Sequence, residues 1–354
     1  MRSCKLLKKS ISLVLSSLEF SPTYSRTFRF PRSLRPRDLL PEIKMLEVPG
    51  GCIWSILSSP PILFIALLFL VTSHALLPTP LFANAEPITV TDDLGRNVRF
   101  MKSPERIVSL APGLTEVLFS LGLDNRIVGV TDYCNYPPEA LSKTRVGGLN
   151  ANIERILALH PDLVVGVAGL YQQENLTRFE RFHIPYFVVD PSSLEKIFGT
   201  ILVFGKIADV KKTAVERVRQ LRARLDGVRQ RVRSLPPVRL LYVVDKEPLI
   251  SVGKGSYLGD LIREAGGINI AGGLEKAYPI LSMEYVIQQD PQVIILAMDA
   301  DRTLSDQERR YWDRWSSLSA VRYGKIYKVD RDLLNRPGPR IIDGLEEMAR
   351  LLHP

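Results

Sequence analysis

The sequence predicts an α/β protein with two lobes, each a mainly parallel sheet flanked by helices, joined by one long helix. Short runs rich in β-branched residues alternate with stretches of helical apolar spacing, and this alternation occurs in two separate blocks of the chain. Between the blocks lies a proline-free stretch whose apolar residues recur in steps of three and four. A length of 354 residues and an apolar fraction of 45% suit two folded units of ordinary composition.

The chain begins with a segment that resembles no folded element. Residues 1–52 are rich in Arg, Ser and Pro and show no periodicity, so we expect a disordered extension or a misassigned start. Translation from Met45 is the alternative start. It is disfavoured because no Lys or Arg lies between Met45 and Ile62, where a signal peptide carries its positive charge.

Residues 53–85 are expected to be a secretory signal peptide. The apolar run 62–71 spans ten residues, which is short for a membrane-spanning helix. Ala83 and Ala85 then provide the small residues of a cleavage site, so we expect cleavage after Ala85. An uncleaved membrane anchor is the alternative, which two adjacent prolines before the run disfavour. The sequence therefore predicts a periplasmic or otherwise extracytoplasmic protein.

Charge and cysteine content narrow the function. Ten Lys/Arg and four Asp/Glu lie in residues 1–85, so most of the net charge of +9 is N-terminal and a nucleic-acid partner is not expected. Cys4 and Cys52 precede the expected cleavage point. Cys134 then remains alone and cannot form an internal disulfide.

The two blocks are placed at residues 86–208 and 235–354. Strand-like runs occur in both blocks at 106–111, 126–131, 163–167, 186–190, 238–245, 293–298 and 325–330. Helical spacing occurs between them at 115–123, 152–160, 174–182, 257–267 and 282–290. Strands that alternate with helices favour a parallel sheet covered by helices.

A bridging helix is expected over 209–234. From residue 211 to residue 234 there is no proline and a single glycine, which predicts roughly 24 helical residues and a length of about 36 Å. The apolar positions of this stretch are Val215, Val218, Leu221, Leu225, Val228 and Val232. A single stiff connection would limit hinge motion between the lobes. An ordinary surface helix of one domain is the alternative.

Several motifs in order resemble one transport family. The segments "RIVSLAPGLTEVLFSLGL", "RIVGVTDYCNYPPEA" and "NIERILALHPDLVV" closely resemble the first lobe of ABC-transporter substrate-binding proteins of the cobalamin and ferric-siderophore group. "SVGKGSYLGDLIREAGGINI" and "NRPGPRI" resemble its second lobe. The resemblance runs from about Val98 to the C-terminus. "TDYCNYPPEA" followed by "ERILALHPDLV" is most similar to the vitamin B12-binding branch.

This resemblance implies one ligand in a cleft between the lobes, at the C-terminal ends of the strands. Tyr133 and Tyr136 would then face a large, flat, partly apolar ligand. Tyrosine offers a broad contact area and a hydroxyl at little cost in rotamer entropy. The alternative is that one of the two tyrosines packs against the end of the sheet.

Five more residues are expected near the ligand. Tyr278 and Arg336 would come from the second lobe, and Arg336 could donate to a propionamide carbonyl or to anionic oxygens of a siderophore. Its alternative is an ion pair with Asp332. The remaining three candidates come from the first lobe and are Pro112, Gly113 and Tyr171. The first two lie at a strand-to-helix turn, where backbone amides can approach a ligand.

The family resemblance also implies partners. Glu154 and Glu284 match the glutamates, one per lobe, through which such proteins dock on arginines of a membrane permease, which works with an ATPase. The alternative is that each carboxylate only stabilises the start of a helix. We expect a monomer that carries cobalamin, or a ferric siderophore or haem, as transported ligand and needs no cofactor.

The sequence departs from the B12-binding branch in its tryptophans. That branch often lines its cleft with tryptophan, and no tryptophan stands at Gly148, Val167 or Leu333. Trp312 and Trp315 lie in another helical stretch, where we expect them to pack on a helix face. A siderophore or haem therefore stays open as the ligand.

Other function classes find less support in the sequence. A receptor for bare metal ions would need several converging ligands, whereas His160 and His183 stand at element ends where a structural role is expected. An enzyme is not expected, because Lys254 lacks the spacing of a phosphate loop and Cys134 has no histidine near it in sequence. A purely structural scaffold is the last alternative.

Overall fold

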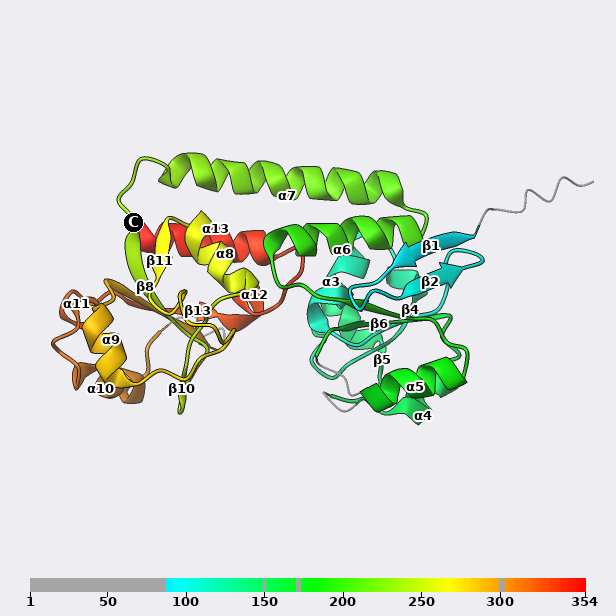
Figure 1. The fold of residues 1–354 in the computed structure, drawn as a ribbon, viewed down its shortest axis with the longest axis horizontal. Coiled ribbons are helices and arrows are strands. Elements are labelled where there is room, and N and C mark those ends of the chain that lie inside the picture. Colours follow the sequence, from blue (N-terminus) through cyan, green and yellow to red (C-terminus); the bar gives the residue numbers. More distant parts are fainter. Residues whose placement is uncertain (1–86, 149–150, 170–172, 299–302) are drawn as a thin grey trace, which may run out of the picture. The chain divides into compact units, whose positions relative to one another are not determined.

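The computed structural model describes residues 87–148, 151–169, 173–298 and 303–354, which belong to one compact unit, Ala83–Pro354 (Figure 1). The extension, signal peptide and cleavage site predicted for residues 1–85 lie outside these ranges. The fold is α/β with two lobes, each built on a parallel sheet, as predicted. The exact division at residues 208 and 234 stays a prediction.

The first lobe contains a five-stranded parallel sheet. Its spatial order is β5 (Thr144–Arg145), β4 (Ile127–Val130), β3 (Ile107–Ser109), β6 (Leu163–Val167) and β7 (Tyr186–Val189). An antiparallel hairpin, which the sequence interpretation missed, precedes the sheet as β1 (Ile88–Thr91) and β2 (Asn97–Phe100). The helices of this lobe are α3 (Pro112–Ser120), α4 (Ile153–Ala158), α5 (Gln173–Arg181) and α6 (Leu194–Ile207).

Alternate residues of these strands enter two different cores. Ile107 and Phe187 belong to one hydrophobic cluster, whereas their neighbours Val108 and Tyr186 belong to another. Successive side chains of a strand point to opposite faces of the sheet, so a sheet with two covered faces needs apolar residues at nearly every position. This is why the strands appear in the sequence as continuous apolar runs.

The second lobe repeats the design with a four-stranded parallel sheet. Its order is β11 (Gly267–Asn269), β8 (Val238–Val243), β12 (Val293–Met298) and β13 (Ile326–Asp330). A short hairpin pairs β9 (Asp245–Lys246) with β10 (Leu249–Ile250). The helices are α8 (Tyr257–Glu264), α9 (Met283–Gln289), α10 (Asp306–Asp313), α11 (Ser319–Arg322), α12 (Arg331–Leu334) and α13 (Ile341–Leu352).

Helix α7 (Lys211–Val232) connects the two blocks over 22 residues. It contacts α6 of the first lobe and α8 and α13 of the second, and Figure 1 shows α7 running alongside them. Its buried residues are Ala214, Val218, Leu221, Leu225, Val228 and Val232. The prediction for Val215 was wrong, because this side chain is 60% exposed and Ala214 takes the buried position. The steps of four and three then place one continuous stripe against both lobes.

Helices α6 and α13 were not identified from the sequence, although both pack beneath α7. At one point the backbones of α6 and α7 come very close, because a Cβ placed on Gly205 would lie 2.3 Å from the Cβ of Ala214. Such an approach needs glycine on one helix and a small residue on the other.

We expect Gly205→Ala to lower the free energy of unfolding by about 1–3 kcal/mol, since the added methyl group overpacks this crossing. Gly199→Ala in the same helix is the matched control. A Cβ there meets nothing within 4 Å, so the better helix propensity of alanine should raise stability slightly. Urea unfolding of both variants measures the difference, and equal effects would contradict the close crossing.

Candidate functional site

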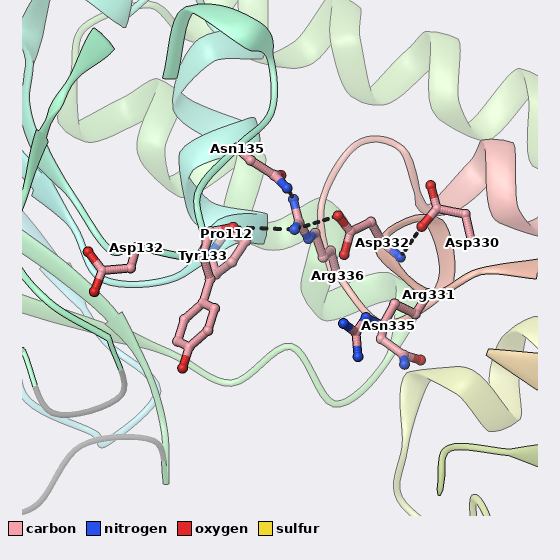
Figure 2. Close-up of a pocket in the computed structure, with 9 residues that line it drawn as sticks. All are labelled: Pro112, Asp132, Tyr133, Asn135, Asp330, Arg331, Asp332, Asn335 and Arg336. Carbon is pink, nitrogen blue, oxygen red and sulfur yellow. Dashed lines mark hydrogen bonds and ion pairs between the residues drawn. The ribbon is translucent and has the colours of Figure 1, made fainter. Parts of the chain in front are cut away.

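A cleft of about 600 Å³ lies where strands of both sheets end, and Figure 2 shows its lining residues. The first lobe contributes the start of α3 and the loop after β4, and the second lobe contributes the end of β13, α12 and the turn that follows. The lining residues are Pro112, Asp132, Tyr133, Asn135, Asp330, Arg331, Asp332, Asn335 and Arg336. The predicted position at the carboxyl ends of parallel strands agrees with this arrangement.

Hydrogen bonds to its backbone and to its buried cysteine hold the loop after β4 in place, and Tyr133 projects from this loop. The Arg145 guanidinium donates to the carbonyl oxygens of Thr131 and Cys134 at 2.7 and 2.8 Å. The Cys134 side chain is fully buried and lies 3.1 Å from the hydroxyls of Thr115 and Thr131. Cys134 therefore holds the loop in place, as expected of a structural thiol.

Tyr133 presents an apolar ring on the cleft wall. The residue is 53% exposed and lines the cleft. A Cβ on Gly148, one of the positions without tryptophan, would contact the Tyr133 ring at 3.4 Å. A larger residue at Gly148 would therefore share this wall with Tyr133, whereas glycine leaves the phenol ring as the aromatic surface there.

Tyr136 lies in a different environment from Tyr133. The guanidinium carbon of Arg340 is 3.7 Å from the centroid of the Tyr136 ring. One face of this ring is therefore covered by a cation from the second lobe, and Tyr136 is not among the residues that line the cleft. Contact between Tyr136 and a ligand stays a prediction, and the ring face that Arg340 covers is not open to that ligand.

Pro112 and Gly113 begin α3, three residues before the helix start that the sequence predicted. Proline is tolerated in the first turn of a helix because its missing N–H would have no partner there. Pro112 lines the cleft, but a Cβ on Gly113 would lie 2.5 Å from the carbonyl oxygen of Pro337. The structure thus places Gly113 in a close backbone contact with the second lobe.

Arg336 lines the cleft and also forms the ion pair that was its alternative. Its guanidinium lies 2.6 Å from an Asp332 carboxylate oxygen and donates to Asn135 Oδ1 at 2.6 Å (Figure 2). A longer bond of 3.3 Å reaches the Tyr133 carbonyl oxygen. The Arg336 side chain is only 11% exposed, and these donors already have partners. Its main role in this structure is therefore to connect the two walls of the cleft rather than to donate to a ligand.

Sequence reasoning missed Glu116, which is the most buried charge near the cleft. Arg340 donates to both of its carboxylate oxygens, at 2.9 and 2.6 Å, and an Arg336 nitrogen lies 3.7 Å away. Burial raises the pKa of Glu116 above its ordinary value, and the hydrogen bond from Arg340 offsets part of that rise. The available signal was a single carboxylate within the apolar run "LTEVLF".

Tyr278 is half exposed in the second lobe, close to two buried tyrosines. Burial raises the pKa of Tyr257, and the Tyr278 hydroxyl adds to this rise. The nearby Tyr242 hydroxyl donates to Asn335 Oδ1 at 2.7 Å, which holds a cleft residue in place. Tyr278 is not among the lining residues, and Tyr171 lies outside the described residues, so both stay predictions.

The two glutamates expected to dock on a permease occupy equivalent positions in their lobes. Glu154 follows the N-cap Asn152 by two residues, and Glu284 follows the N-cap Ser282 by two. Hydrogen bonds from its own backbone amide and from Ser282 lower the pKa of Glu284, so it is ionised near neutral pH. Glu154 is exposed and lies 3.5 Å from Arg178.

Hydrogen bonds near both glutamates place them on the side of each sheet where the strands have their carboxyl ends, which is also the side of the cleft. The amide of Asn152 donates to Val146, which directly follows the edge strand β5. The Tyr285 hydroxyl donates to Ile270, which directly follows the edge strand β11. In both lobes the first turn of the helix is therefore held at the carboxyl end of an edge strand.

The remaining candidates lie in structural positions. Trp312 is fully buried and Trp315 packs against the same hydrophobic cluster of the second lobe, as expected. His160 and His183 have left-handed backbones after α4 and α5, where their amides donate to the preceding turns. Lys254 pairs with Glu275 at 3.1 Å.

The described residues contain neither a metal-ion cluster nor a membrane-spanning helix. No group of three or more His, Cys, Asp or Glu within the described ranges is arranged to hold a metal ion. Among the helices of the same ranges, none has the length and apolar character that crossing a membrane requires.

Comparison with known proteins agrees with this geometry. A family model described as periplasmic binding protein matches residues 107–333. The crystal structure of the periplasmic vitamin B12 binding protein BtuF of Vibrio cholerae is 30% identical, with a TM-score of 0.63, and covers 70% of this chain and 96% of that chain. The heme-binding protein RhuT from Roseiflexus sp. RS-1 is 25% identical, with a TM-score of 0.62, and covers 71% and 98%.

A curated relative adds the transporter class. The uncharacterized ABC transporter substrate-binding lipoprotein YvrC of Bacillus subtilis (strain 168) is 27% identical over 275 residues, which are 76% of this chain and 86% of the relative. The matched family region contains Tyr133 and Glu116 and ends at residue 333, just before Arg336 and Arg340.

Proposed function

Because this chain belongs to the periplasmic binding protein family, we propose that it is the extracytoplasmic substrate-binding component of an ABC importer that carries cobalamin or a related large metal chelate. The observation that carries the proposal is the exposed Tyr133 ring on the wall of a cleft built by both lobes. Similarity to a vitamin B12-binding protein and to an ABC transporter lipoprotein supports the same assignment.

The chemistry of the cleft suits a chelate that is apolar on its faces and polar around its edge. A volume of about 600 Å³ falls in the range of small-molecule sites. Tyr133 offers a ring face to a flat macrocycle, while Asp132, Asn135 and Asn335 offer carboxylate and amide groups. Cobalamin carries amide side chains around its corrin ring, and such amides both donate and accept hydrogen bonds.

Calorimetric titration of residues 86–354 with cyanocobalamin tests this proposal. We expect saturable 1:1 binding, which Tyr133→Ala should weaken by about 1–3 kcal/mol, as for a central aromatic contact. Tyr323→Ala is the matched control, because Tyr323 is 68% exposed but does not line the cleft. Equal affinity of the two variants would remove Tyr133 from the binding surface.

Haem or a ferric siderophore is the second candidate cargo. The similarity to RhuT and the glycine at position 148, where the B12-binding branch often has tryptophan, favour it. Titration of the same protein with haem, followed by absorbance, and with a ferric hydroxamate distinguishes the two. If cyanocobalamin gives no heat and either of these chelates binds, the cargo is corrected while the receptor function stands.

The same proposal includes export and delivery. The protein would leave the cytoplasm through its signal peptide, with cleavage after Ala85, and the intact mass of the exported protein tests that position. Delivery would proceed by docking of both lobes on the permease through Glu154 and Glu284. The monomeric state stays a prediction, which light scattering measures.

A further inference from the structure

A cluster of charges joins the two lobes beside the cleft. Glu116 belongs to α3 of the first lobe, whereas Arg336 and Arg340 belong to the turn between α12 and α13 of the second. Arg340 donates from the edge of its guanidinium to both oxygens of Glu116, and the guanidinium face covers the Tyr136 ring of the first lobe. Arg336 reaches the first lobe at Asn135 and the Tyr133 carbonyl.

The cluster is buried enough for its hydrogen bonds to fix the distance and the relative orientation of Glu116 and the two arginines. The side chains of Glu116, Arg340 and Arg336 are 2%, 16% and 11% exposed. A two-point guanidinium–carboxylate bond has one preferred geometry, and its strength grows where water is excluded. Next to it, Gly113 and Pro337 bring the backbones of the two lobes into direct contact.

These contacts lie beside the cleft and add to the connections that the lobes already share through α7 and through α6 and α8, where the Leu194 amide donates to Asp260. Those other connections involve none of the residues that line the cleft. A directional ion pair at the cleft restrains the cleft walls themselves. The charge cluster also contacts residues that line the cleft. These residues are Arg336 and its partners Tyr133, Asn135 and Asp332.

We propose that Glu116, held by Arg340 and Arg336, is a positioning residue that keeps the two lobes at the separation required for ligand binding before the ligand arrives. Glu116 need not touch the ligand. It acts through the relative placement of the cleft walls. The effect on ligand binding rests on the proposed receptor function, whereas the effect on lobe separation does not.

A positioning role has a kinetic signature that a lost ligand contact lacks. If Glu116→Gln leaves only about a tenth of the molecules with competent lobe spacing, the apparent affinity falls about tenfold. This loss appears in the association rate constant, because the competent molecules still bind and release ligand normally. Loss of a direct contact would instead raise the dissociation rate constant.

Double electron–electron resonance, which measures the distance between two spin labels, tests the proposal directly on the unliganded full chain. Spin labels are placed at exposed positions of the two lobes, Leu141→Cys and Ile280→Cys, with Cys4 and Cys52 replaced by serine. The buried Cys134 is left in place. We expect a narrow distance distribution in the parent protein and a broader one in Glu116→Gln.

Asp92→Asn is the matched control. Asp92 is fully buried and paired with Arg96 at 2.7 Å, but both belong to the first lobe. This variant should lose stability without broadening the distribution. Arg340→Lys, which keeps the charge but not the two-point bond, should broaden it partly and serves if Glu116→Gln does not fold.

The outcomes separate the two proposals. A distribution as narrow in Glu116→Gln and Arg340→Lys as in the parent overturns the positioning role, whatever ligand the protein carries. Stopped-flow mixing with cyanocobalamin then adds the rate constants. Failure of the parent protein to bind cyanocobalamin would remove that cargo and leave the distance result in force. A raised dissociation rate constant with unchanged distances would make Glu116 a ligand contact and overturn the inference.

Discussion

Replacing Arg340 with methionine is expected to lower the free energy of unfolding by about 3–5 kcal/mol, because the change leaves the Glu116 carboxylate buried without its two-point partner. Methionine keeps much of the length of the side chain and removes its charge. The stacking of the guanidinium on the Tyr136 ring is lost as well. Arg336, 3.7 Å from Glu116, compensates only in part. Urea unfolding measures the loss.

A double-mutant cycle assigns this loss to the pair. In Glu116→Gln/Arg340→Met the buried group is an uncharged amide, which costs less to bury than a carboxylate. The double variant should therefore recover much of the stability that Arg340→Met loses. If the two single effects simply add, Glu116 and Arg340 are not energetically coupled and the interpretation of the pair is wrong.

The pH dependence gives an independent check on the same variants. Burial raises the pKa of folded Glu116 above its ordinary 4.5, and the nearby Asp332 carboxylate adds to this rise, although Arg340 and Arg336 lower it. For an acid with a raised folded pKa, stability is greatest below the ordinary value and is lost as the pH rises through the folded pKa. Loss of Arg340 raises that pKa further. The destabilisation should shrink between pH 7 and pH 5 in Arg340→Met, but not in the double variant.

Reversing both docking charges, Glu154→Arg together with Glu284→Arg, is expected to weaken the complex with the permease by about 100-fold or more. Like charges brought together across an interface cost several kcal/mol, and loss of attraction also slows encounter. Each glutamate sits in the first turn of a helix at the carboxyl end of an edge strand, one per lobe. Affinity for the permease in nanodiscs and uptake by cells measure the effect.

The matched control reverses one exposed glutamate in each lobe elsewhere, Glu105→Arg with Glu275→Arg. This pair makes the same change in net charge and should leave permease affinity within a few-fold. Ligand affinity should be unchanged in both double variants, because none of the four residues lines the cleft. Equal loss of permease affinity in the two would show a dependence on net charge and remove Glu154 and Glu284 as specific contacts.

The sequence was most informative where local physics decides the outcome. Each of the seven predicted strands overlaps an observed one, because a parallel sheet covered on both faces needs continuous apolar runs. The sequence predicted every buried apolar position of α7 except the first. That position is Ala214 and not Val215, because close contact with Gly205 needs a small side chain. Helices α6 and α13 were missed, although both pack against that stripe.

Within the cleft, the sequence alone placed Tyr133 and Pro112 after predicted strands, and the family resemblance added Arg336 and implied a common ligand. The tertiary structure then separated two tyrosines that look equivalent in "YCNY": Tyr133 is on the cleft wall, while Tyr136 lies beneath Arg340. It also joined Glu116 to Arg340, 224 residues away in sequence. Periodicity and turn chemistry report on neighbours along the chain. The partner of a buried charge depends on how two lobes meet, and no local pattern encodes it.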